Sequence, residues 1–270
     1  MSSVDGALRA AAAVGPYFSW EPWTSGDGWR PLTDLSDLDV VAERVDAARQ
    51  ALVGMFGLAE DAVPLRVVAS VTFLGVASRL LSPPLGALVL GGTLPTPGPD
   101  RLWWKPVAGG PWPIAYGSVA GVPGDGATLV ATTVNGLVAP VLHAFQERFV
   151  LSPQVLWGNV ASALAGAAGM LADTQPHDRV TGLDDCAAIG QPGVGGRAGD
   201  VVAQALTVPP LAGTGTLVQP DPARARRFLV RHNCCLYYRI PGAGTCGDCV
   251  LTPSADRRRD WQSVLATHPR

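Results

Sequence analysis

The segment Ser36–Phe56, SDLDVVAERVDAARQALVGMF, carries the clearest helical pattern of the chain. Its apolar residues recur at spacings of three and four, so they fall on one stripe of a helix and would face a core. Ser36 is expected to cap the start of this helix, and Gly54 or Gly57 to end it. The stripe consists of Leu38, Val41, Val45, Ala48, Leu52 and Met55.

Further helices are expected on the C-terminal side of this segment. One of them is apolar on nearly every side, which predicts a buried helix that begins at Pro64 and is stopped by Ser82-Pro83-Pro84. Another has Ser152 at its cap and Pro153 in its first turn. A third would be kinked or interrupted at Pro140. The expected helices are Pro64–Leu81, Asn135–Phe149, Ser152–Leu171, a short basic helix Asp221–Arg231, and Ser254–Ala266.

The middle of the chain predicts a small β element. Gly and Pro are dense in Gly91–Gly126, and short strands are expected at Leu102–Lys105 and Ile114–Ser118. Thr128–Val134 is β-branched and fits either a strand or a direct lead into the next helix. Gln175–Gly199 is polar and Gly-rich, which indicates a connector and an internal boundary. The predicted fold class is therefore mainly α with a small central β element.

Composition excludes several classes of protein. Of 270 residues, 47% are hydrophobic and 16% charged, and the net charge is -2, which argues against a disordered chain or a nucleic-acid-coating protein. The N-terminus has no basic region before its short Ala run, so a signal peptide is not expected. Pro, Gly or polar residues interrupt every long uncharged stretch, so no membrane span is expected. The prediction is a cytoplasmic protein.

Four of the five cysteines lie within sixteen residues. Cys234, Cys235, Cys246 and Cys249 form the pattern C-C-x10-C-x2-C, and the fifth is Cys186. Disulfides would need an oxidising compartment. Zinc suits the C-x2-C half, but adjacent cysteines in extended backbone point opposite ways and suit one small ion badly. An iron–sulfur cluster is larger and accepts thiolates from more varied directions. The spacing alone leaves all three chemistries open.

The segment Arg231–Leu251, RHNCCLYYRIPGAGTCGDCVL, resembles the C-terminal [2Fe–2S] motif of the FhuF-like ferric siderophore reductases. The cysteine spacing matches without gaps, as do the Arg before the pair, the Tyr-Arg after it and the Gly-rich turn. A weaker likeness covers Phe149–Ala163, FVLSPQVLWGNVASA, which is similar to the helical core that this family shares with siderophore synthetases.

The resemblance implies a [2Fe–2S] cluster held by Cys234, Cys235, Cys246 and Cys249, and a cytoplasmic reductase for ferric siderophores, of hydroxamate type. It also implies a siderophore-binding body (residues 1–220) and a cluster module (221–270). The sequence offers no convincing nicotinamide or flavin motif, so an external electron donor such as a ferredoxin or flavin reductase is expected. Peripheral contact with membrane transport machinery would suit the role, and nucleic acid is not expected. Fe(III) binds anionic oxygen chelators very tightly and Fe(II) far more weakly, so one electron releases the metal.

Four residues outside the cysteines are candidates for contact with the siderophore. Trp157 would line its pocket, Asn159 would bond one of its carbonyls, and Arg148 and Arg239 would meet its anionic oxygens. Each of these side chains can also be explained without a ligand, as an ordinary core, packing or solvent-exposed residue. A further group in the Gly- and Pro-rich middle could form an aromatic wall for a bulky ligand. It consists of Trp103, Trp104 and Trp112.

Several features have weaker readings. His232, two residues before Cys234, suits a hydrogen bond near the cluster better than a ligand role. Cys186 reads as an ordinary reduced cysteine. Gly193–Ala198 matches the G-x-G-x-x-A pattern of dinucleotide-binding loops, but Gln191-Pro192 precedes it where a strand should end. A flexible connector is therefore expected there. Two basic runs, residues 224–231 and 257–259, read as solvated helix faces or as a docking surface for an acidic electron donor.

Two functions of other classes compete with the reductase. One is a siderophore or iron carrier with a structural metal site and no turnover. The other is an iron–sulfur electron carrier or sensor without a siderophore site. Only a redox-active cluster together with a bound ferric chelate supports reduction, so these two properties separate the three functions.

Overall fold

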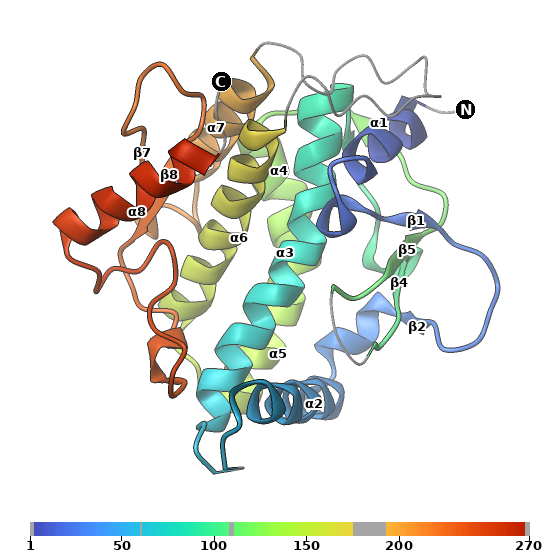
Figure 1. Cartoon of the computed structure of the whole chain (residues 1–270). Coiled ribbons are helices and arrows are strands. Elements are labelled where there is room, and N and C mark those ends of the chain that lie inside the picture. The colour runs from blue at the N-terminus through green and yellow to red at the C-terminus, as the bar shows by residue number, and fades with distance from the viewer. Residues whose placement is uncertain (1–2, 60, 108–110, 175–192, 268–270) are drawn as a thin grey trace.

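The computed structural model describes residues 3–59, 61–107, 111–174 and 193–267. Helix α3 runs through the middle of the fold, with α1 and α6 packed along it and α2 crossing near its start (Figure 1). Helix α7 packs on α6. The helices are α1 (Ser3–Ala12), α2 (Leu38–Phe56), α3 (Leu65–Gly91), α4 (Gly126–Leu129), α5 (Ala139–Phe149), α6 (Pro153–Asp173), α7 (Val194–Ala205) and α8 (Ser254–Thr267). The fold is mainly α, as predicted from the sequence.

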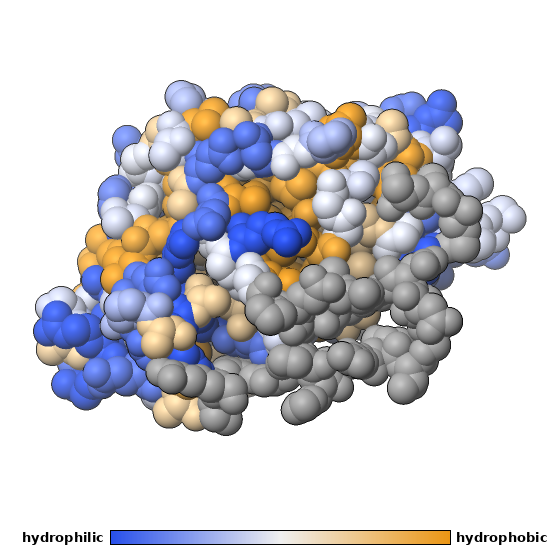
Figure 2. Space-filling model, turned by 90° about the horizontal axis from the view of Figure 1, so that it is seen from above, coloured by the Kyte–Doolittle hydropathy of each residue, from blue (hydrophilic) through white to orange (hydrophobic). Residues whose placement is uncertain are grey.

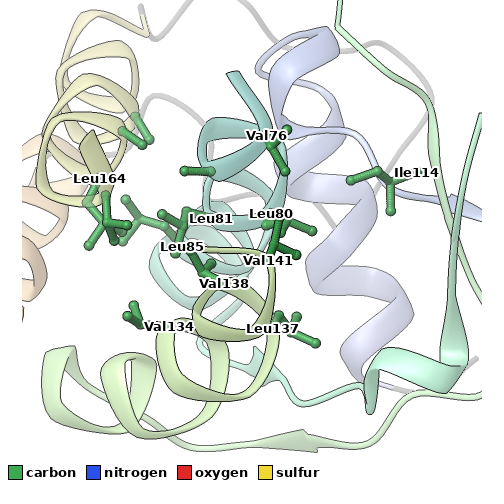
Figure 3. Close-up of a cluster of buried hydrophobic side chains, with 14 of the residues drawn as sticks. Val76, Leu80, Leu81, Leu85, Ile114, Val134, Leu137, Val138, Val141 and Leu164 are labelled. Atoms are coloured by element: carbon green, nitrogen blue, oxygen red, sulfur yellow. The ribbon is translucent and has the colours of Figure 1, made fainter. Parts of the chain in front are cut away.

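The core lies between α3, α5 and α6. Figure 3 shows Leu81 and Leu85 of α3 close to Val138 and Val141, with Leu164 of α6 on the other side. All five side chains are buried. Burial of a Val or Leu side chain contributes about 1.5–3 kcal/mol, so this layer is a main source of stability.

The predicted helix Ser36–Phe56 is confirmed as α2, with one change at its start. The cap is Asp37, whose side chain accepts from the backbone N–H groups of Asp39 and Val40, and Ser36 belongs to the preceding turn. Asp and Ser are both good caps. The helix ends at Gly57, whose φ of 61° is left-handed, as expected for a C-terminal glycine.

The predicted stop of the second helix at Ser82-Pro83-Pro84 is wrong. Helix α3 continues through both prolines to Gly91. Pro83 has no N–H for the carbonyl of Arg79, one turn earlier. The indole N–H of Trp20 donates to that carbonyl instead, at 3.1 Å. A tertiary hydrogen bond therefore satisfies the group that the proline leaves open.

The small β element is confirmed in the middle of the chain. β4 and β5 pair antiparallel, with Trp103 opposite Ala115, inside a four-stranded sheet of order β1-β5-β4-β2. Two further strands, β3 and β6, pair beside it. The strands are β1 (Glu21–Pro22), β2 (Arg30–Pro31), β3 (Leu94–Pro95), β4 (Leu102–Trp104), β5 (Ile114–Tyr116), β6 (Gly121–Val122), β7 (Gly215–Val218) and β8 (Phe228–Arg231). Short 3-10 turns are η1 (Pro16–Phe18), η2 (Leu32–Ser36), η3 (Pro99–Arg101) and η5 (Tyr237–Arg239).

Thr128–Val134 follows the second of its two expected courses and leads directly into a helix. Asp125 caps α4, and the chain continues through a π-helical stretch, η4 (Val130–Val138), into α5. The helix is not interrupted at Pro140, which lies in the first turn of α5, and the alternative of a kink there stays a prediction. The wide π turns relax the hydrogen-bond pattern just before the proline.

The predicted basic helix Asp221–Arg231 is wrong. Residues 228–231 form β8, which pairs antiparallel with β7. This hairpin runs across the division between residues 220 and 221, so the two proposed parts share a sheet. The expected flexible connector at Gly193–Ala198 is also wrong from Val194 onward, because α7 begins there and Gly195 packs closely on Ala172 of α6. The predicted last helix is confirmed as α8.

Three helices are long and apolar enough, by length and composition, to cross a membrane: α3, the continuous helix 126–149, and α6. This search covers only the residues that the structure describes, and the three helices found there are longer than the sequence pattern predicted. Their most apolar windows are 83%, 56% and 67% buried inside the protein. Most of this apolar surface therefore contacts the core, although apolar residues also lie exposed between hydrophilic ones on the face seen in Figure 2.

Candidate metal centre

The four clustered cysteines lie on an irregular loop that follows β8. Cys234 and Cys235 come just after the strand, and the loop then turns through η5. Gly242 and Gly244 have positive φ values of 80° and 74°, which turn the chain back toward the first pair. Leu236 also adopts a left-handed conformation, with φ of 70°, directly after the cysteine pair. The loop therefore returns Cys246 to the vicinity of Cys235.

The thiols are free and partly grouped. Cys235 and Cys249 are buried, Cys234 and Cys246 are half-buried, and none of the four forms a disulfide. The Sγ atoms of Cys235 and Cys246 are 3.4 Å apart. Two thiolates on one iron or zinc atom, each at about 2.3 Å, would lie roughly 3.8 Å apart. One pair of sulfurs therefore already stands near the spacing that a single metal atom requires.

The full set does not converge on one ion. Among the residues that the structure describes, no group of three or more His, Cys, Asp or Glu side chains is placed to hold a single metal ion. A [2Fe–2S] cluster divides its four thiolates between two irons, so it does not require all four sulfurs to meet at one point. The donor set fits such a cluster better than it fits one zinc ion.

Backbone N–H groups point at two of the sulfurs. The N–H of Leu236 donates to Cys234 Sγ at 3.3 Å, and the N–H of Leu251 donates to Cys249 Sγ at 3.4 Å. Hydrogen bonds of this kind stabilise negative charge on the sulfur and raise the potential of a bound cluster. The left-handed Leu236 directs the first of these bonds.

The metal-free thiols are electrostatically unequal. The hydrogen bond between Cys235 and Cys246 lowers the pKa of Cys235 to about 6 and raises the pKa of Cys246. Burial raises the pKa of Cys234. Of this pair, Cys235 therefore loses its proton more readily, and the thiolate is the form in which cysteine binds metals.

A buried arginine lies beside the cysteine pair. Arg231 is 1% exposed, and its Nη2 donates to Asn159 Oδ1 at 2.7 Å and to Asn233 Oδ1 at 3.2 Å. Its Nε donates to the carbonyl of Asn233 at 3.3 Å, and its Nη1 is buried with no hydrogen-bond partner among the described residues. These acceptors are neutral. A buried cation of this kind would stabilise added negative charge on the thiolate loop.

The same network attaches the cysteine loop to the helical core. Asn159 of α6 donates through Nδ2 to the carbonyl of Ser70 at 2.8 Å, and the Ser70 hydroxyl of α3 donates to the carbonyl of Cys235 at 2.8 Å. Farther along the loop, Ser162 of α6 donates to Asp248, which lies between Cys246 and Cys249. Two long helices therefore hold both halves of the cysteine pattern.

The predicted siderophore-contacting residues differ in their burial and in their contacts. Asn159 is fully buried in the Arg231 network. Trp157 is half-buried and packs on the core, and Arg148 is exposed with its guanidinium over the ring of Phe149. Arg239 is exposed and donates to the hydroxyl of Tyr238 at 3.4 Å. A direct contact of these four residues with a siderophore stays a prediction.

Other candidates also have defined positions. His232 is exposed and bonds Thr216 and the carbonyl of Gly213 across the β7–β8 hairpin. Cys186 lies outside the described residues. The prediction that the basic run 224–231 forms a solvated face is only partly correct. Arg226 pairs with Asp173, and Arg227 pairs with Asp200.

Among the described residues, one pocket borders the cysteine loop and a larger one lies between two helices. The larger, about 530 Å³, is a groove between α2 and α3 that is closed on one side by Trp112. The smaller, about 280 Å³, lies between α6, β8 and α8 and is lined by Gly247 and Asp248 of the loop. Sequence reasoning missed both, apart from Trp112 in the expected aromatic wall. Trp104 of that wall is buried, and Trp103 stacks on Trp23 at 4.7 Å.

Comparison with known families gives one match. Residues 231–251 match the family described as the FhuF 2Fe-2S C-terminal domain, which is consistent with an FhuF-like protein. The matched residues include all four clustered cysteines and Arg231. No curated protein matches the chain. The match supports a [2Fe–2S] cluster as the cofactor, in agreement with the four free thiols of the loop.

Proposed function

We propose that this chain, in which residues 231–251 form an FhuF-type [2Fe–2S] segment, is a ferric-siderophore reductase. The observation that carries the proposal is the cysteine loop itself. It carries four free thiols, two of them 3.4 Å apart, beside a buried arginine whose side-chain acceptors in the described part of the chain are neutral, and hydrogen bonds anchor the loop to two core helices. Such a site is built to hold a small cluster rigidly and to stabilise added electron density.

In this proposal Cys234, Cys235, Cys246 and Cys249 hold the cluster, which supplies one-electron chemistry when bound. The N–H groups of Leu236 and Leu251 stabilise the charge on two of the thiolates. Arg231 adds a positive charge beside them, and Asn159 and Ser70 fix its position and that of the Cys235 backbone.

The substrate is Fe(III) in an oxygen-rich chelate, which we take to be a hydroxamate siderophore. The chelated Fe(III) gains one electron and becomes Fe(II), which the chelate holds far more weakly. The electron comes from an external donor such as a ferredoxin or a flavin reductase. The setting of the proposal is the cytoplasm, with peripheral contact to membrane transport machinery.

An iron–sulfur electron carrier or sensor is the main competing function, because it would use the same cysteine loop. It would have no site for a ferric chelate. A siderophore carrier with a structural metal would bind the chelate but would not transfer an electron to it. Cluster content and chelate reduction therefore separate the three functions.

The decisive experiment is anaerobic purification followed by visible spectroscopy and assays of iron, acid-labile sulfide and zinc. We expect a coloured protein with about two irons and two sulfides per chain. Dithionite should bleach it, and a ferric hydroxamate should restore the colour as Fe(II) forms. A colourless protein with about one zinc per chain would exclude the redox function.

A further inference from the structure

We infer that the groove between α2 and α3 is the binding site for the ferric chelate, an inference that rests on the proposed reductase function. At about 530 Å³ the groove falls within the range of small-molecule sites, about 300–1,000 Å³. It reaches solvent beside Met55, whose side chain is 75% exposed. A bulky ligand can therefore enter without any rearrangement of the core.

The lining combines apolar surface with cationic groups. Leu52, Val71 and Val76 supply aliphatic contacts, and Trp112 supplies an aromatic wall. Arg44 and Arg79 also line the groove. This combination suits a chelate with an apolar backbone and electron-rich oxygens around its iron.

Within the part of the chain that the structure describes, two polar atoms in the lining, on Arg44 and Thr72, are unpaired. Arg79, in contrast, has its donors engaged, and Arg44 also pairs with Glu43 through Nη2. Arg79 is 4% exposed and donates to the carbonyl oxygens of Pro16, Ser19 and Trp112, which are neutral acceptors. Among the described residues, Arg44 Nε and Thr72 Oγ1 are buried and have no hydrogen-bond partner. Buried polar atoms are nearly always paired, so these two atoms favour a bound ligand that accepts their hydrogen bonds.

Both walls of the groove continue to the cysteine loop. On α2, Phe56 follows Met55 of the lining, and its ring lies 4.0 Å from the position of a Cβ at Gly242. On α3, Ser70 precedes Val71 of the lining and donates to the carbonyl of Cys235. On each wall, a residue of the groove lining is therefore next in sequence to a residue that lies against the cysteine loop.

The smaller pocket between α6 and α8 is the rival site. It touches the loop directly through Gly247 and Asp248, but at about 280 Å³ it is about half the size of the groove. Arg226 and Arg227 of its lining pair with Asp173 and Asp200, and Arg226 Nε and Trp261 Nε1 are buried without a hydrogen-bond partner among the described residues. The two pockets therefore differ in volume rather than in unpaired polar atoms. The groove between α2 and α3 is therefore the better match for a bulky chelate.

Two glycines allow a matched test of the two pockets. Gly75 lines the groove and Gly166 lines the rival pocket; both lie inside long helices. At each, an added Cβ meets no described atom within 4 Å. Leucine is a better helix former than glycine, so Gly75→Leu and Gly166→Leu should each fold and fill one pocket. Circular dichroism and cluster content confirm that both proteins are intact.

The ligand probe is the gallium(III) complex of desferrioxamine B, a hydroxamate chelate that cannot be reduced under these conditions. Its binding to the cluster-loaded protein is measured by isothermal titration calorimetry. We expect Gly75→Leu to weaken binding at least tenfold and Gly166→Leu to leave it within twofold of the unmodified protein. The reverse pattern, or unchanged binding in both variants, would overturn the assignment of the groove.

Reduction of the ferric complex by the unmodified protein is measured in parallel. If Gly75→Leu reduces the ferric complex as fast as the unmodified protein does, the groove is not the binding site, but the reductase function is unaffected. A redox-active cluster in a protein that neither binds the gallium chelate nor reduces the ferric one contradicts the reductase function itself.

Discussion

Arg231, the last residue of β8, and Asn159, in the middle of α6, form a buried hydrogen bond of 2.7 Å between Nη2 and Oδ1. The bond joins the start of the cysteine segment to the helical core. Asn159 also donates to Ser70, which in turn donates to the carbonyl of Cys235. One asparagine therefore connects the charge beside the thiols with the backbone that carries them.

Asn159→Ala should destabilise the protein by about 2–3 kcal/mol, because it removes a hydrogen bond to a buried charged group and leaves Arg231 less satisfied. Urea unfolding of the cluster-loaded protein measures the change. Gln154→Ala, at an exposed position of the same helix, is the control and should change stability by less than about 0.5 kcal/mol. Equal effects of the two substitutions would contradict the structural role of Asn159.

Gly158→Ala should loosen the cysteine loop. A Cβ at Gly158 would overlap the side-chain amide of Asn233, the residue just before Cys234. Overpacking of this kind costs about 1–3 kcal/mol, and the loop should give way before the helix does. We expect iron to be lost faster on exposure to a chelator, and the decrease in visible absorbance measures this rate.

The control for Gly158 lies two turns farther along α6. A Cβ at Gly166 meets nothing within 4 Å, so Gly166→Ala should retain iron as the unmodified protein does and gain up to about 1 kcal/mol of stability. Iron loss at the same rate in both variants would mean that close packing at Gly158 does not hold the loop.

Arg231→Gln should lower the reduction potential of the cluster. Reduction adds a negative charge, and the buried guanidinium next to the thiols favours it. The expected shift is on the order of 60 mV, which is tenfold in the equilibrium constant of a one-electron couple. Arg231→Lys keeps the charge and should shift the potential less. A redox titration monitored by absorbance measures all variants.

Arg239→Gln is the control for Arg231, because Arg239 lies in the same loop but is exposed. Water screens an exposed charge, so its removal should change the potential little. If both substitutions lower the potential equally, net charge rather than the buried position of Arg231 sets the effect.

The helices with strong local signals were predicted well from sequence, and the errors arose where distant residues decide the structure. The stripe of Ser36–Phe56 predicts α2 to within two residues. The continuation of α3 through Pro83 depends on the indole of Trp20, which is 63 positions away and supplies the missing hydrogen bond. Strand β8 forms because β7 pairs with it, and a run of arginines does not reveal such a partner.

The cysteines of the candidate site could be identified from their spacing, but their surroundings could not. Asn159 was expected to contact a siderophore, whereas the structure gives it Arg231 and Ser70 as buried partners. This structural role of Asn159 becomes visible only when α6 packs against β8 and places the buried amide beside Arg231. The groove is assembled from Tyr17, α2, α3 and Trp112, and no local pattern links them.

Tyr116 should contribute a stability that is lost at high pH. Its hydroxyl donates to Asp5 Oδ1 at 3.3 Å, and burial raises the pKa of Tyr116 to about 12. The pKa in the unfolded chain is about 10, so the folded state favours the neutral phenol. This stability is fully present below about pH 10 and is lost as the pH rises through 12. Urea unfolding from pH 8 to 12 should show a smaller decline in Tyr116→Phe than in the unmodified protein.

Cys246→Ser should abolish normal cluster assembly. The Sγ atoms of Cys246 and Cys235 are 3.4 Å apart, so the substitution removes one sulfur of a thiol pair that stands near single-metal spacing. We expect most of the roughly two irons and two sulfides per chain to be lost, while the far-ultraviolet circular dichroism of the helices is kept. Cys186→Ser is the control, because Cys186 lies outside the matched segment, and it should retain full iron and sulfide. If Cys246→Ser kept its full iron and sulfide content, the assignment of the four ligands would be wrong. Loss in both variants would instead make Cys186 a fifth participant in cluster assembly.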